Sequence, residues 1–237
     1  SRIESFTSEY TNPLTMPVGS GVSLLAFDFE TTDPTWQRTF QAVRARPIGV
    51  SLAVREGEAI YWPTTDVALL KPVLEAPSVI KVAHNAVFEY IVARGCGIRP
   101  TNLHCTKLMA YVLRRPSTHL KDLAWGEFGI RQTRFEAVDW ADAAAVAQYG
   151  AADADMALRL YNKLGAALCE AGLWELYELE RAALPALAEM TIRGITLDAR
   201  PLVELAGRLE VELGEREAEL REFFHAAALP VEDALAL

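Results

Sequence analysis

The chain has 237 residues, of which 51% are hydrophobic, and a formal net charge of −9 at pH 7. This length and composition predict one or two globular domains with a sizeable core. No apolar run approaches the roughly 20 residues that a membrane helix needs, and no secretory signal is visible, so we expect no membrane partner. The three cysteines, Cys96, Cys105 and Cys169, lack metal-ligand spacing and predict reduced thiols in a cytoplasmic compartment.

The first third of the chain carries mainly strand patterns. Residues 1–21 are rich in Ser, Thr, Pro and Gly and predict a loose lead-in. An apolar run at 24–27 predicts a buried strand over about 22–28. Two further strands are predicted over about 48–54 and 59–62, on either side of a turn at Gly57. A helix over about 66–75 and a short strand over about 79–83 follow.

Helical patterns dominate from residue 85 onward. A helix is predicted over about 85–94, ended by Gly95 and Gly97, before a short strand near 101–104. Further helices are predicted over about 105–113, 119–128, 140–149 and 151–170. Three strands that can pair antiparallel, followed by strand–helix alternation, predict the α/β class with a mixed sheet flanked by helices.

The character of the sequence changes at Gly172. A helix is predicted over about 173–192, and Asp198 is a suitable cap for a long helix that ends near residue 225. That last helix has an apolar stripe, which either packs on a neighbouring helix or meets a coiled-coil or other partner. Its members are Leu202, Leu205, Leu209, Leu213, Leu220 and Phe223. Because the chain starts without Met, we expect an excised or processed piece.

Acidic residues stand out at three places along the chain. Asp28 and Glu30 are two apart in the first strand and therefore share one face. Tyr149 and Asp153 are four apart in a helical segment and share a face as well, and Glu89 lies in the helix near 85–94. Carboxylates brought together repel one another unless a cation is present. An all-oxygen carboxylate site suits magnesium or manganese.

Each pattern alone also has an ordinary interpretation. An Asp-x-Glu pair after a strand is commonly solvated, His84-Asn85 is a common capping turn, and Tyr-x-x-x-Asp is a common helix surface. Their order and spacing together resemble the Exo I, Exo II and Exo III motifs of the DEDD 3′–5′ exonucleases. This superfamily includes ribonuclease D and the proofreading domain of family A (polymerase I-like) DNA polymerases. The motifs occupy residues 28–32, 85–89 and 149–153.

The resemblance extends beyond the motifs, over about residues 22–222. Segments 105–113 and 118–124 resemble the family's following helices, and 184–198 resembles the entry to a family A polymerase thumb. Tyr149 corresponds to the tyrosine subclass, because the histidine subclass has His where this chain has Gln148. Two positions depart from the common pattern: Glu89 and Cys105 stand where the family more often has Asp.

The resemblance implies a fold, a site and a mechanism. It implies a ribonuclease H-like domain over 22–172, followed by a helical extension over 173–237. It implies two Mg²⁺ or Mn²⁺ ions, held by Asp28, Glu30, Glu89 and Asp153, with Tyr149 orienting the attacking water. By the same resemblance, Thr31, Thr32, Asn85 and Phe88 line the binding site of the terminal nucleotide.

The resemblance also implies partners and a location. The expected substrate is the 3′ end of single-stranded DNA, with a DNA polymerase module in cis or in trans, in the cytoplasm of a bacterial or phage-infected cell. Two alternatives stay open: a ribonuclease D-like RNA exonuclease, and a non-catalytic DNA-binding domain of a polymerase.

The negative net charge argues against a nucleic-acid binder, but the charges are unevenly distributed. Between residues 90 and 135, basic side chains outnumber acidic ones, and they form either a surface that follows phosphates or an ordinary solvated surface. The basic members are Arg94, Arg99, Lys107, Arg114, Arg115, Lys121, Arg131 and Arg134.

Overall fold

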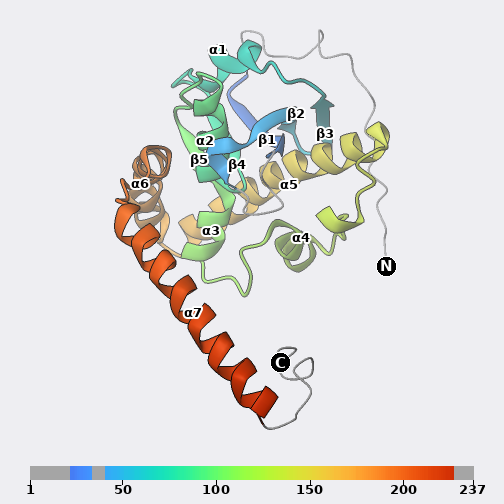
Figure 1. Cartoon of the computed structure of the whole chain (residues 1–237). Helices are drawn as coiled ribbons and strands as arrows, with labels where there is room; N and C mark the ends of the chain where they lie inside the picture. The colour runs from blue at the N-terminus through green and yellow to red at the C-terminus, as the bar shows by residue number, and fades with distance from the viewer. Residues whose placement is uncertain (1–21, 34–40, 227–237) are drawn as a thin grey trace. The chain divides into compact units, whose positions relative to one another are not determined.

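The computed structural model describes residues 22–33 and 41–226 (Figure 1). The chain divides into two compact units, Ser1–Arg193 and Gly194–Leu237. The first unit holds a β-sheet with its surrounding helices. The described part of the second unit contains helix α7 (Arg200–Ala226). None of the helices in the described ranges is long and apolar enough to cross a membrane.

The sheet of the first unit is five-stranded and mixed, as the sequence predicts. Its strands are β1 (Leu24–Thr32), β2 (Arg46–Arg55), β3 (Glu58–Trp62), β4 (Ile80–Ala83) and β5 (Leu103–Cys105), in the order β3-β2-β1-β4-β5. The β3-β2-β1 half is antiparallel, and β1-β4-β5 is parallel. β1 continues to Thr32 because its pairing with β2 runs on to Arg46. The predicted strand end at residue 28 was therefore too early.

The two faces of β1 have different partners. Leu25, Phe27 and Phe29 lie in the main hydrophobic core with residues of α2 (Ala86–Gly95), such as Ile91. The alternate residues face the opposite way, where Ala26 packs with alanines of α5 (Ala143–Glu170). Asp28 and Glu30 continue the Ala26 face, because side chains alternate along a strand. Both acids are thereby directed toward α5.

Helix α5 is one continuous helix, whereas the sequence suggested two helices separated at Gly150. A Cβ atom at Gly150 would overlap the hydroxyl of Ser51 on β2 and lie 3.1 Å from Cδ2 of Tyr61 on β3. Glycine usually destabilises a helix interior by about 1 kcal/mol. Here its missing side chain lets α5 approach the sheet closely, so the glycine marks a contact rather than a helix end.

The remaining helices surround this core. α3 (Thr106–Val112) and α4 (Leu120–Phe128) pack on α5 through a second buried cluster that contains Met109, Leu123 and Leu160. Short 3₁₀ turns η2 (Ala42–Arg44) and η4 (Phe135–Ala137) lie in connections. The helix predicted near 66–75 is a 3₁₀ turn, η3 (Ala68–Leu70), that continues into the short α1 (Lys71–Leu74).

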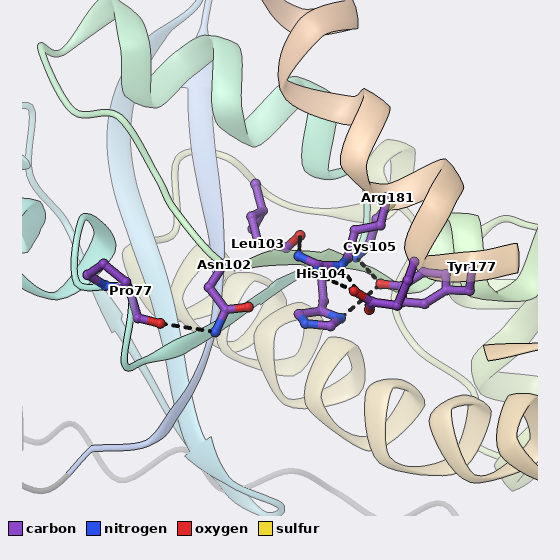
Figure 2. A network of polar contacts seen from close by, with 8 residues as sticks. Pro77, Asn102, Leu103, His104, Cys105, Tyr177 and Arg181 are labelled. Atoms are coloured by element: carbon purple, nitrogen blue, oxygen red, sulfur yellow. Dashed lines mark hydrogen bonds and ion pairs between the residues drawn. The ribbon is translucent and has the colours of Figure 1, made fainter. Parts of the chain in front are cut away.

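Helix α6 (Trp174–Arg193) belongs to the first unit and is fixed at both of its ends. Near its start, Tyr177 hydrogen-bonds to β5, as Figure 2 shows. Near its end, Glu189 accepts hydrogen bonds from Arg94 at 2.7 Å and from Tyr90 at 3.2 Å, both on α2. In the second unit, the amide of Arg200 donates to Asp198 at 3.1 Å, as expected of a cap before α7.

Candidate active site

Asp28 and Glu30 stand side by side on the α5 face of β1, and their carboxyl groups share a hydrogen bond. Burial, together with the charge of nearby Asp153, raises the pKa of Asp28 to about 7. Burial and the neighbouring Asp28 raise the pKa of Glu30 to about 9. The fold thus places two like charges in a poorly hydrated position, where losing both protons is unfavourable.

Glu89 reaches the same place from the other side of the sheet. The pairing of β4 with β1 ends at Ala26, so the amide of Phe29 lies past the last β4 partner. Glu89, in the first turn of α2, accepts a hydrogen bond from that amide at 3.0 Å. Burial and the charge of Asp28 raise the pKa of Glu89, and the Phe29 hydrogen bond opposes this. A third carboxyl group thus joins the first two.

Tyr149 and Asp153 complete the cluster from one face of α5. Asp153 is 5% exposed and accepts hydrogen bonds from the ammonium of Lys121 and, at 3.3 Å, from Nε2 of Gln132. Tyr149 hydrogen-bonds to Asp153. Burial raises the pKa of Asp153 although Lys121 and Tyr149 oppose it, and burial together with Asp153 raises the pKa of Tyr149. The phenol of Tyr149 therefore keeps its proton at neutral pH.

Two other side chains border Tyr149 that the sequence analysis did not place in the metal site. The Lys121 ammonium lies 4.4 Å from the centre of the Tyr149 ring. Trp140 meets the same ring edge-on at 5.8 Å, and Phe135 contacts Trp140 at 4.8 Å. Lys121 stands in the family-like segment 118–124, so a signal for it existed. Trp140 and Gln132 lie in the connection between α4 and α5, where no periodic pattern singled them out.

The carboxyl groups fit a hard cation, although they are not yet arranged around one point. Within the described residues, no group of three or more His, Cys, Asp or Glu side chains is placed to hold a metal ion as it stands. The donors are nevertheless all oxygens, which magnesium and manganese prefer. Oε1 of Glu30 is buried without a hydrogen-bond partner, and such an orphaned acceptor requires compensation. A cation near Glu30 would supply it.

The four residues predicted to bind the terminal nucleotide lie at two element ends. Thr31 and Thr32 end β1, with Thr32 exposed. Asn85 is exposed at the start of α2 and makes no side-chain cap, so the capping interpretation of that residue is not supported. Phe88 is half-buried against the hydrophobic core. Their role in binding stays a prediction.

Two titratable residues near the motifs have structural partners. Asp155 pairs with Arg159 at 2.6 Å and accepts a hydrogen bond from the amide of Gly57 at 2.6 Å. The His84 ring bonds to the Thr106 hydroxyl at 2.9 Å and to the Thr118 carbonyl at 3.0 Å. Burial lowers the pKa of His84 to about 4, so the ring is neutral.

The basic segment between residues 90 and 135 is partly neutralised by the fold. Four of its members pair with carboxylates: Arg94 with Glu189, Arg115 with Glu127, Lys121 with Asp153 and Arg134 with Asp122. Arg114 and Arg131 are exposed. A surface that follows phosphates therefore stays a prediction, and it would have fewer members than the sequence suggested.

Comparison with known proteins identifies the family. Residues 18–168 match the family model described as 3′-5′ exonuclease, of the family A DNA polymerase type. The chain belongs to this family. DNA polymerase I of Rhizobium leguminosarum is 32% identical over 83% of this chain, and DNA polymerase I of Pseudomonas aeruginosa is 32% identical over 81%. The chain spans only 23% of the length of each of these relatives.

Solved structures confirm the ribonuclease H-like exonuclease fold. Brucella melitensis NrnC superposes with a TM-score of 0.63 at 22% identity, covering 73% of this chain and 87% of that protein. Escherichia coli RNase D superposes with a TM-score of 0.54 at 21% identity, covering 75% of this chain and 46% of that protein. At such identities the likeness concerns the fold alone.

Proposed function

We propose that this exonuclease domain is metal-dependent and removes nucleotides from the 3′ end of single-stranded or frayed DNA, releasing nucleoside monophosphates. The observation that carries the proposal is the meeting of Asp28 and Glu30, Glu89, and Tyr149 with Asp153. They come from three separate elements, β1, α2 and α5. Glu89 accepts a hydrogen bond from the amide of Phe29, which lies between Asp28 and Glu30, and Tyr149 hydrogen-bonds to Asp153. Perturbed carboxyl groups gathered in this way are typical of catalytic sites.

The carboxylates are proposed as ligands of two divalent ions. Asp28, Glu30 and Asp153 would hold the ion on the side of the attacking water, and Asp28 with Glu89 would hold the second. Bound magnesium or manganese would activate water and stabilise the leaving oxygen of the phosphodiester. The orphaned Oε1 of Glu30 and the raised pKa values of these acids support this assignment.

Tyr149 is proposed to orient the attacking water through its hydroxyl. Its raised pKa excludes a phenolate base near neutral pH, so a hydrogen-bonding role fits it better than proton removal. Thr31, Thr32, Asn85 and Phe88 are proposed to contact the terminal nucleotide. Stacking of a base on Phe88 would be tolerant of sequence, as a proofreading enzyme requires.

DNA is favoured as the substrate because the relatives in sequence are DNA polymerases, and a polymerase module in cis is the proposed partner. RNA is the alternative, because E. coli RNase D, an exoribonuclease, shares the fold. A non-catalytic DNA-binding role is disfavoured, because all the acidic positions of the three motifs carry carboxylates.

The test uses the 237-residue chain with 5′-labelled DNA and RNA oligonucleotides of identical sequence, single-stranded or paired. We expect loss of 3′ nucleotides from DNA faster than from RNA, and from single strands faster than from duplexes, because a terminal nucleotide must leave its pair to reach the site. EDTA should abolish the activity, and Mg²⁺ or Mn²⁺ should restore it. Full activity in EDTA would refute the metal proposal, and a preference for RNA would establish the alternative.

A further inference from the structure

Lys121 makes contacts that an ordinary surface lysine does not make. It stands in the first turn of α4, and its side chain is 15% exposed. Its ammonium donates to Oδ1 of Asp153 and lies 4.4 Å from the ring centre of Tyr149. One cation thus contacts both of the α5 residues that the proposed function uses.

The charge of Lys121 acts on Asp28 and Glu30 as well as on Asp153, which it contacts. Its charge lowers the pKa of Asp28, Glu30 and Asp153, against the upward effect of burial on each. A cation in a carboxylate cluster stabilises the charged acids as a metal ion would. Lys121 is therefore placed where it would oppose the binding of another cation.

Gln132 gives Asp153 a second, uncharged support. Its Nε2 donates to the carbonyl of Ala152 at 2.8 Å and to Oδ1 of Asp153 at 3.3 Å. An amide contributes no net charge, so this contact can persist beside a bound metal ion. Release of Lys121 from Asp153 would therefore leave the carboxylate oriented.

We infer that Lys121 is a positioning residue that holds Asp153 and Tyr149 in place while no metal is bound, and that competes with the divalent ion for Asp153. The inference rests on the proposed function, because it requires Asp153 to be a metal ligand. It assigns to α4 a part in metal binding that the motif residues by themselves do not supply.

Lys163 provides a matched control on α5. It pairs with Glu127 at 3.4 Å and lies 4.8 Å from the centre of the Phe128 ring, so it has the same two kinds of partner as Lys121. Its side chain is more exposed, at 44%, and its partners are not among the proposed ligands. Lys163→Met removes the same charge without altering the carboxylate cluster.

The experiment measures the affinity for Mn²⁺ by isothermal titration calorimetry, and the melting temperature in EDTA and in Mn²⁺. Lys121→Met should bind Mn²⁺ roughly tenfold more tightly than the parent, because the competing charged hydrogen bond is gone. It should melt at a lower temperature than the parent in EDTA, and its melting temperature should rise more than that of the parent when Mn²⁺ is added. Lys121→Arg and Lys163→Met should stay within about threefold of the parent affinity. If Lys121→Met does not fold, Lys121→Gln makes the same test.

The possible outcomes separate the two proposals. Equal or weaker Mn²⁺ binding by Lys121→Met, with a parent that binds Mn²⁺, overturns the competition while leaving the metal site intact. A parent that binds no Mn²⁺ overturns the proposed function, and the inference with it. Tighter binding by Lys163→Met to the same degree would show a general charge effect and would also overturn the specific role of Lys121.

Discussion

Two buried polar clusters of the first unit differ in how completely they are satisfied. At the junction of β5 and α6, the Tyr177 hydroxyl accepts from the amide of Cys105 at 3.2 Å and is 3.1 Å from Nδ1 of His104 (Figure 2). Burial lowers the pKa of His104 to about 4, so its ring is neutral and Nδ1 can accept the Tyr177 proton. The Tyr177 hydroxyl, the Cys105 amide and Nδ1 of His104 thus each have a partner of the complementary kind.

The carboxylate cluster between β1, α2 and α5 is built in the opposite way. Asp28, Glu30, Glu89 and Asp153 would repel one another if all were ionised, Lys121 supplies a single positive charge, and Oε1 of Glu30 has no hydrogen-bond partner. Burial raises the pKa of all four acids. The first cluster stabilises the fold, whereas the second is electrostatically unfavourable, and the proposed metal ions would relieve it. Such a contrast is expected between a structural cluster and a functional one.

Replacing Asp28 should lower the activity without lowering the thermal stability. Asp28→Ala should lower the rate of nucleotide release by roughly 1,000-fold or more, because a shared metal ligand is lost. Its melting temperature in EDTA should be unchanged or higher, because one repelling charge is gone. Asp155→Ala, at a buried carboxylate of α5 that pairs with Arg159, is the control. It should retain activity and melt at a lower temperature. Loss of activity in Asp155→Ala, with retained activity in Asp28→Ala, would contradict the contrast between the two kinds of cluster.

Replacing Glu89 tests whether the charge or the length of its side chain matters more for activity. Glu89→Gln should reduce activity by roughly 100-fold or more, since the second metal loses a negative ligand. Glu89→Asp should keep a measurable fraction, although its shorter side chain loses the hydrogen bond from Phe29. Mn²⁺ should support this variant better than Mg²⁺, which requires stricter octahedral geometry. If Glu89→Gln released nucleotides as fast as the parent, Glu89 would not be a metal ligand.

Replacing Tyr149 should lower the rate of nucleotide release without weakening metal binding. Tyr149→Phe removes the hydroxyl and keeps the ring that packs with Trp140 and Lys121. We expect catalysis to slow by roughly 10- to 1,000-fold, with an unchanged affinity for Mn²⁺ measured by calorimetry. A rate equal to that of the parent would return Tyr149 to a packing role.

Changes in the network around Tyr177 should alter the stability of the fold and leave the activity unchanged. Tyr177→Phe leaves the Cys105 amide and the His104 ring without their partner, which should lower the free energy of unfolding by about 1–3 kcal/mol. For a chain of this size the melting temperature should fall by several degrees, with little change in the rate of nucleotide release. Tyr111→Phe, at a side chain that is 68% exposed, is the matched control and should change neither.

The pH dependence of stability should reveal the carboxylate cluster. The folded pKa values of Asp28 and Glu30, about 7 and about 9, lie above their ordinary values. Their contribution to stability is complete below those ordinary values and is lost as pH rises through the folded ones. In EDTA, the melting temperature should therefore fall between pH 7 and 8, where His84 and His104 are already neutral. Glu30→Gln should flatten this slope, and an identical slope in that variant would contradict the assignment.

The sequence was sufficient for the mixed sheet and for the family, whereas the metal chemistry of the three motifs stays a prediction. Alternation along β1 placed Asp28 and Glu30 on one face, and helical spacing placed Tyr149 with Asp153 on another. These regularities depend only on backbone geometry, which the local sequence determines. The long helix near 198–225 was also evident, because its apolar stripe repeats over several turns.

The tertiary structure decided what local patterns cannot encode. Gly150 was expected to separate two helices, but its lack of a side chain is needed where α5 meets Ser51 and Tyr61. The length of β1 depended on its pairing with β2, and the Phe29 amide became available to Glu89 because β4 ends early. Lys121 and Gln132 contact Asp153 although they lie 32 and 21 residues before it in the chain. Such contacts join segments distant in the chain, so packing, rather than periodicity, determines them.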